Sequence, residues 1–206
     1  MPETSEDTQR RNEQDPCAVA RSIAGLMKAF GSGEMAALRR LGEDIAVPAY
    51  WRLAARHDVL HARREAWAPI VRALAILTPK APPEQRSDER YKLDDPKRRL
   101  GTALCDGGQA SWPGTLAPGA DPRPLLSEAR LGQLLAARGR QRTLLLTRAV
   151  RALAASRDVG VGLDVGDLAW RFLDPDPERL AAPYYARLDR AERAASTDTT
   201  ERARHA

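Results

Sequence analysis

Cysteine is scarce in this chain of 206 residues, which has only Cys17 and Cys105 and no CxxC pair. The sequence therefore indicates neither a disulfide framework nor a cysteine zinc site, and unpaired thiols fit a reducing cytoplasm. Long hydrophobic runs are also missing. The longest apolar stretch, at 70–77, contains Arg72 and is far shorter than the roughly 20 residues that a membrane-spanning helix needs. The polar N-terminus does not resemble a secretory signal. We therefore expect a cytoplasmic protein that does not associate with membranes.

Aromatic residues account for only 5% of the chain and hydrophobic residues for 43%, a balance typical of helices built on alanine and leucine. Apolar residues recur at helical spacing, and no segment is a convincing strand. The sequence predicts an all-α, two-lobed bundle of about eight or nine helices. The expected division is a disordered arm at 1–15, an N-terminal helical domain at 16–106 with a mobile loop at 78–97, a linker at 107–124, a C-terminal helical domain at 125–193 and a disordered tail at 194–206.

Catalytic motifs are missing as well. The chain has no P-loop, GxGxxG, GxSxG or kinase motif. His57 and His61 lie one helical turn apart, with Asp58 beside the first. This resembles the zinc-protease pattern HExxH, except that the acid is aspartate, whose side chain is one methylene shorter than that of glutamate. Glu65 is available as a third ligand. His57-Asp58 fits a helix start equally well. We therefore expect no enzyme, metal or cofactor, and an enzyme using the two histidines remains an alternative.

Lysine is rare and arginine abundant, with 4 and 29 residues among the 33 basic residues. Eight of these arginines, against one glutamate, give residues 123–157 a formal charge of +7, whereas the whole chain carries only +5. A solvated helix face normally interleaves acidic residues with its arginines, but residues 130–157 contain no aspartate or glutamate. Uncompensated guanidinium groups favour a polyanionic partner bound through its phosphates, independently of sequence.

Two other interpretations remain open. A helical transcription regulator would need a recognition helix and an operator preference. A scaffold without nucleic-acid contacts would leave the arginines as a solvated face.

Four segments resemble the CasB family, the small subunit of the type I-E CRISPR surveillance complex called Cascade. They are GEMAALRRL at 33–41, PAYWRL at 48–53, LGTAL at 100–104 and SEARL at 127–131, the last followed by an arginine-bearing helix rich in leucine. Their order and spacing carry the resemblance across about 19–188. The long loop at 78–97 and the DPDP sequence at 174–177 depart from the family pattern, so we assign no binding role to the last helical region.

The resemblance implies an all-helical, non-catalytic subunit that associates head to tail as a dimer along Cascade. It also implies that the subunit stabilises the R-loop through contacts with the displaced DNA strand and nearby crRNA or target backbone. Replacing a DNA duplex by a guide–target hybrid is nearly isoenergetic, so modest contacts can tip that balance. The family positions and the charge pattern together predict one continuous basic groove formed by Arg39, Arg40, Arg52, Arg130, Arg138, Arg140, Arg142 and Arg148.

Overall fold

The computed structural model describes residues 15–42, 46–114 and 120–204, and these residues form helices. Within those ranges there is no strand, only an isolated bridge between Asp94 and Leu163. The all-α prediction is confirmed, with somewhat more helices than expected. The α-helices are α2 (Pro16–Met27), α3 (Ser32–Arg39), α4 (Pro48–Ala54), α5 (Asp58–Ala62), α6 (Arg64–Leu77), α7 (Leu100–Asp106), α8 (Glu128–Ala136), α9 (Gly139–Ser156), α10 (Val165–Leu173) and α11 (Glu178–Arg204). Two short 3₁₀ helices, η1 (Pro83–Gln85) and η2 (Glu89–Tyr91), lie between α6 and α7.

Local sequence explains where several helices begin and end. Asp15 precedes α2 and its carboxylate accepts the backbone N–H of Cys17, while Asp164 accepts two backbone N–H groups at the start of α10. These are the side-chain caps that exposed helix N–H groups require. Gly139 has a positive φ of 51° at the break between α8 and α9. A glycine in the left-handed region therefore marks the turn between two leucine-bearing helices.

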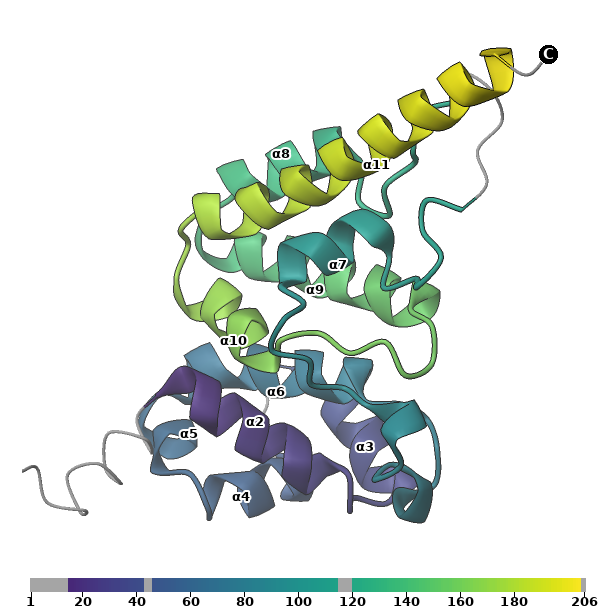
Figure 1. Ribbon diagram of the computed structural model, residues 1–206. Coiled ribbons are helices and arrows are strands. Elements are labelled where there is room, and N and C mark those ends of the chain that lie inside the picture. Colours follow the sequence, from purple (N-terminus) through teal and green to yellow (C-terminus); the bar gives the residue numbers. More distant parts are fainter. Residues whose placement is uncertain (1–14, 43–45, 115–119, 205–206) are drawn as a thin grey trace, which may run out of the picture.

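The helices are arranged in two lobes (Figure 1). Helices α2 to α6 form one lobe, and α7, α8, α9 and α11 form most of the other, with α10 at the junction. Helix α10 packs against α2 and α6, and α7 packs mainly against α11. The chain therefore crosses between the lobes more than once. The sequence-based division at 107–124 stays a prediction, although α7 packs with the helices that follow that boundary.

One continuous hydrophobic core joins the two lobes, from Val19 in α2 to Leu188 in α11. Gly101 is central to the contact between α7 and α11. A Cβ atom at this position would lie 2.2 Å from the carbonyl oxygen of Leu180 and 2.8 Å from Cγ of Pro183. Only glycine allows the two helices to approach this closely.

The segments between the helices are tied to the same body. In the loop at 78–97, the buried Arg86 donates to the carbonyl oxygen of Phe30 at 2.6 Å and to that of Ala81 at 2.8 Å.

At the other end of the chain, α11 continues to Arg204 through most of the range expected as a disordered tail. The mobility of both segments stays a prediction, and the expected arm lies outside the described residues except for Asp15. None of the described helices is long and apolar enough to span a membrane.

Candidate nucleic-acid interface

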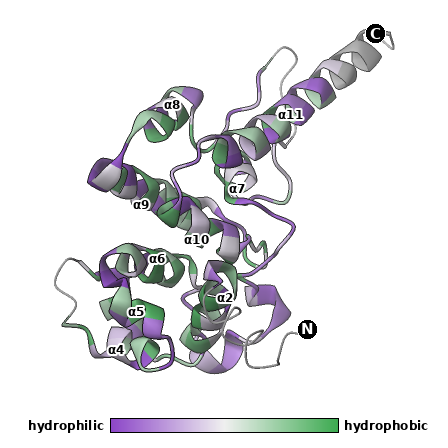
Figure 2. Ribbon diagram, turned by 90° about the vertical axis from the view of Figure 1, so that its left-hand side faces the viewer, coloured by the Kyte–Doolittle hydropathy of each residue, from purple (hydrophilic) through white to green (hydrophobic). Residues whose placement is uncertain are grey.

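Helices α6 and α9 pack side by side, one from each lobe (Figure 2). Residues near their N-terminal ends line one pocket and their C-terminal ends are hydrogen-bonded, so they run in the same direction. At their C-terminal ends, Nη2 of Arg157 donates to the carbonyl oxygen of Leu77 at 2.7 Å. Towards their N-terminal ends, the two helices line a cleft of about 790 Å³. Because each helix comes from a different half of the sequence, only the folded chain forms this cleft.

The cleft combines basic and apolar side chains. Helix α6 contributes Glu65, Ala68, Pro69 and Arg72, α9 contributes Arg140, Thr143, Leu144 and Thr147, and Leu41 and Gly42 border it after α3. Helical spacing continues the α9 side beyond the cleft, because residues 140, 144, 148 and 151 share one face of a helix. All four of these residues are exposed. The charged part of α9 is therefore a stripe with Leu144 in its middle.

Arg72 and Arg151 form a like-charged pair across the two helices. Burial lowers the pKa of Arg72, and the nearby guanidinium of Arg151 lowers it further. An arginine pKa begins so high that Arg72 remains cationic at neutral pH beside the guanidinium of Arg151. Neither makes an ion pair with a carboxylate of the described residues. An anion placed between them would relieve their mutual repulsion.

Three of the arginines expected to bind nucleic acid are exposed on or beside this surface. Arg140 and Arg148 lie on the exposed stripe of α9, and Arg40 is exposed at the end of α3, next to residues that border the cleft. Arg130 is also exposed, on α8, which packs against α9. Arg40, Arg130 and Arg148 have no ion pair with a described carboxylate. Arg40 therefore directly precedes Leu41 at the border of the cleft that α9 lines.

Two further predicted residues interact with helix ends. Arg39 donates to the carbonyl oxygens of Ala75 at 2.9 Å and Thr78 at 3.2 Å, at the C-terminus of α6. Arg138 donates from Nη1 to three carbonyl oxygens at the end of α8, the shortest of these distances being 2.7 Å to Leu135. The last carbonyl groups of a helix lack helical partners, and arginine satisfies them. These guanidinium groups therefore stabilise helix ends.

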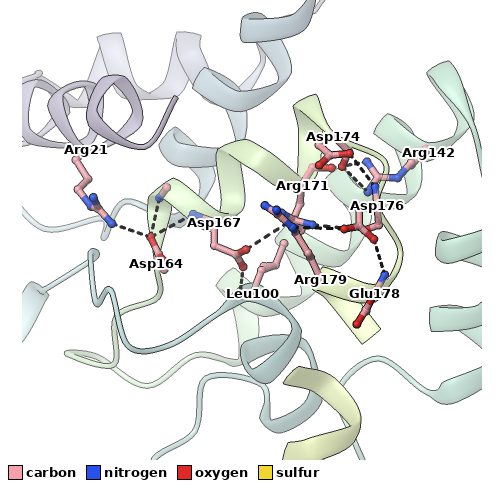
Figure 3. Close-up of polar contacts among 11 residues, drawn as sticks. Arg21, Leu100, Arg142, Asp164, Asp167, Arg171, Asp174, Asp176, Glu178 and Arg179 are labelled. Carbon is pink, nitrogen blue, oxygen red and sulfur yellow. Dashed lines mark hydrogen bonds and ion pairs between the residues drawn. The ribbon is translucent and has the colours of Figure 1, made fainter. Parts of the chain in front are cut away.

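Arg142 is buried, with only 6% of its surface exposed. Its guanidinium donates to the carbonyl oxygens of Arg171 and Asp174 where α10 leads into α11 (Figure 3). Burial, followed by the charge of Arg171, lowers the pKa of Arg142. This side chain is not available on the surface of the folded chain. Its place on α9 explains why: Arg142 is one turn before the buried Leu146 and shares its face.

Arg142 belongs to a polar network around the DPDP sequence. Arg171, only 1% exposed, lies 3.3 Å from Asp167 and donates to the carbonyl oxygen of Asp176 at 3.4 Å (Figure 3). Asp167 in turn accepts the N–H of Leu100 at 2.8 Å. Two buried arginines, Arg142 and Arg171, thus stabilise the connection from α10 to α11. The DPDP sequence at 174–177, which departs from the family pattern, therefore has a structural role.

Arg52 lies elsewhere. It projects from α4 with 68% of its side chain exposed and pairs with Glu34 of α3. In both views α4 lies at the end of the molecule away from α9 (Figures 1 and 2). Arg52 is therefore not brought into the cleft between α6 and α9.

The individual predictions missed Arg72 and Arg151. Arg151 had a local signal, because it continues the spacing of Arg140, Leu144 and Arg148 on α9. Arg72 had a weaker signal, as a charge inside the longest apolar stretch. The packing of α6 on α9 is what makes it part of this surface.

The histidine pair has other contacts. Nε2 of His57 lies 3.1 Å from the hydroxyl of Ser22, and the ring of His61 lies 5.4 Å from that of Trp51. Among the described residues, no group of three histidine, cysteine or acidic side chains is arranged to hold a metal ion.

Comparison with known protein families places the chain. A family model described as CRISPR-associated protein Cse2 (CRISPR_cse2) matches residues 34–202, which is most of the chain. No curated protein and no solved structure matches it. The matched range includes α6, α9 and the arginines on or beside their cleft, which are Arg40, Arg72, Arg140, Arg148 and Arg151. We call these residues and the cleft the α6–α9 surface. The chain therefore belongs to the Cse2 family, also called CasB, which provides the small structural subunit of the type I-E CRISPR Cascade complex.

Proposed function

We propose that this protein is a non-catalytic Cascade subunit that stabilises the R-loop by binding the displaced DNA strand through its phosphates. Nearby crRNA or target backbone is a further contact. The observation that carries the proposal is the α6–α9 surface, where the half-buried Arg72 of α6 meets the exposed arginines of α9, and where Arg72, Arg148 and Arg151 have no described carboxylate partner. Neutralising phosphates with such groups releases counterions and requires no base sequence.

The proposed contact residues are narrower than the set predicted from sequence. We assign phosphate contacts to Arg40, Arg72, Arg140, Arg148 and Arg151, with Arg130 as an outlying contact. The hydrogen bonds of Arg39, Arg138 and Arg142 support a structural role for these three. Arg52 lies at the end of the molecule away from α9, so it suits a contact separate from the α6–α9 surface.

The complex supplies the setting for this surface. We propose that two copies associate head to tail in the cytoplasm, so that their α6–α9 surfaces follow one another along the displaced strand. Two linked sites raise the effective concentration of each site for the same strand. The subunit thereby shifts the nearly isoenergetic exchange of the DNA duplex for the guide–target hybrid towards the open R-loop.

The test is salt-dependent binding of single-stranded DNA by the full chain carrying Arg148→Ala or Arg151→Ala, alongside R-loop formation by Cascade containing each variant. Each substitution should lower the slope of log affinity against log salt by roughly 0.7 and weaken all sequences alike. Arg56→Ala, an exposed arginine beside α4, is the matched control and should leave the slope unchanged.

Unchanged binding and R-loop formation in the variant combining both substitutions would contradict the proposal. Competition with random-sequence DNA adds a second criterion. A strong preference for one sequence would instead indicate a transcription regulator, because phosphate contacts do not discriminate between sequences.

A further inference from the structure

Phosphate binding does not explain the apolar side chains of the cleft between α6 and α9. Leu144 is 45% exposed, although arginines lie one turn before and one turn after it on the same helix. Across from it, α6 contributes Pro69 and Ala68, and Leu41 closes the border. The cleft therefore has an apolar floor flanked by guanidinium groups.

This combination fits a particular state of nucleic acid. In a duplex the faces of the bases are stacked on one another, and only the charged backbone and the polar base edges in the grooves are exposed, so an apolar floor gains little from it. Unpaired nucleotides present base faces as well as phosphates, and a base face that packs on an apolar side chain removes apolar surface from water whatever the base. The exposed arginines supply the charge complementarity that selects a polyanion over an apolar peptide.

We propose that the α6–α9 cleft binds unpaired nucleobases on Leu144 and Pro69 while Arg72, Arg148 and Arg151 hold the adjoining phosphates. The cleft thereby selects single-stranded over duplex nucleic acid. This inference rests on the proposed function and adds the part of the ligand that the apolar floor recognises.

Glu65 fits the same arrangement. It is exposed and lines the cleft at the N-terminal end of α6, away from Arg72 along the helix. A carboxylate repels phosphate, so the backbone of the strand should keep to the Arg148–Arg151 side. Base edges carry N–H donors and tolerate a carboxylate nearby.

The experiment compares two probes, an oligodeoxythymidine strand and an abasic strand of equal length with the same phosphates. The full chain should bind the thymidine strand more tightly. Leu144→Ala should weaken that binding roughly fivefold, the scale expected when part of a leucine side chain is no longer covered, and leave its salt slope unchanged. Abasic-strand binding should not change. Val159→Ala, at a residue 72% exposed and outside the cleft, is the matched control.

Each other outcome has a distinct meaning. Equal binding of both probes by the parent chain and by Leu144→Ala, with a lower slope in Arg148→Ala, would overturn the inference and leave the proposed function standing. Unchanged slopes in the arginine variants would contradict the proposed function itself. If Leu144→Ala instead weakened only the association with other Cascade subunits, the floor would be a protein-docking surface and the inference would be wrong.

Discussion

At the scale of single residues, Arg142 and Arg148 show how two arginines of one helix can differ in role. Arg142 is buried and donates to two backbone carbonyl groups, whereas Arg148 is exposed. A buried carbonyl that loses its donor costs free energy, because water cannot replace the lost hydrogen bond. An exposed side chain that is truncated loses little packing.

We expect Arg142→Met to lower the free energy of unfolding by about 2 to 4 kcal/mol. Arg148→Ala should change it by no more than about 0.5 kcal/mol. Urea unfolding of the two variants and the parent chain measures both values. A stable Arg142→Met variant with weakened DNA binding would show that Arg142 acts as the sequence predicts and not as its contacts indicate.

At the scale of helices, the contact between α7 and α11 depends on a missing side chain. Gly101 faces the backbone of α11, and a backbone carbonyl cannot rotate away from an added methyl group. Overpacking of this kind usually costs about 1 to 3 kcal/mol, and a rigid obstacle places the cost at the upper end. The contact also explains the glycine of the LGTAL segment in physical terms.

Gly101→Ala should therefore destabilise the protein by about 2 to 3 kcal/mol. Gly132→Ala on α8 is the matched control, because nothing lies within 4 Å of its added Cβ atom. That change should stabilise the protein by about 0.5 to 1 kcal/mol, since alanine favours a helix interior over glycine. Thermal unfolding of both variants is the measurement, and equal effects of the two substitutions would refute the close-approach argument.

At the scale of the whole molecule, the two lobes share their core. Helix α10 packs against α2 and α6 although both lie far earlier in the sequence, and Arg157 after α9 donates a hydrogen bond to the end of α6. A lobe removed from its partner would expose apolar surface that the other lobe now covers. We therefore expect the lobes to depend on each other for stability.

We expect the full chain to unfold in a single transition. Tryptophan fluorescence and far-ultraviolet circular dichroism should give coincident urea curves, since Trp67 lies in α6 of one lobe and the ring of Trp112 contacts Arg187 in α11 of the other. A fragment of residues 107–206 should fail to fold, because it lacks α2, α6 and α7. Two separated transitions, or a folded fragment, would favour the two independent domains that the sequence predicts.

Local sequence was sufficient for several features of this protein. Helical periodicity, the acid caps at Asp15 and Asp164, and the break at Gly139 involve residues close in the chain, so the all-α class could be predicted. The excess of arginine over acid in residues 123–157 also needed no structure. Arg142 shares the helical spacing of the buried Leu146, Val150 and Leu153, but the charge pattern assigned it to the basic groove, because a charge on an apolar face stays ambiguous until its partners are known.

Tertiary structure decided which arginines remain available to bind phosphates. Arg39 and Arg142 are taken up by carbonyl groups far away in sequence, while Arg72 becomes part of the surface because α9 packs beside α6. Such assignments depend on contacts between distant segments, which charge and periodicity along the chain do not encode. The sequence by itself determined the helices and the sign and location of the charge. The packing of α6 on α9 determined the cleft, because the two helices are brought together only by burial of a shared core.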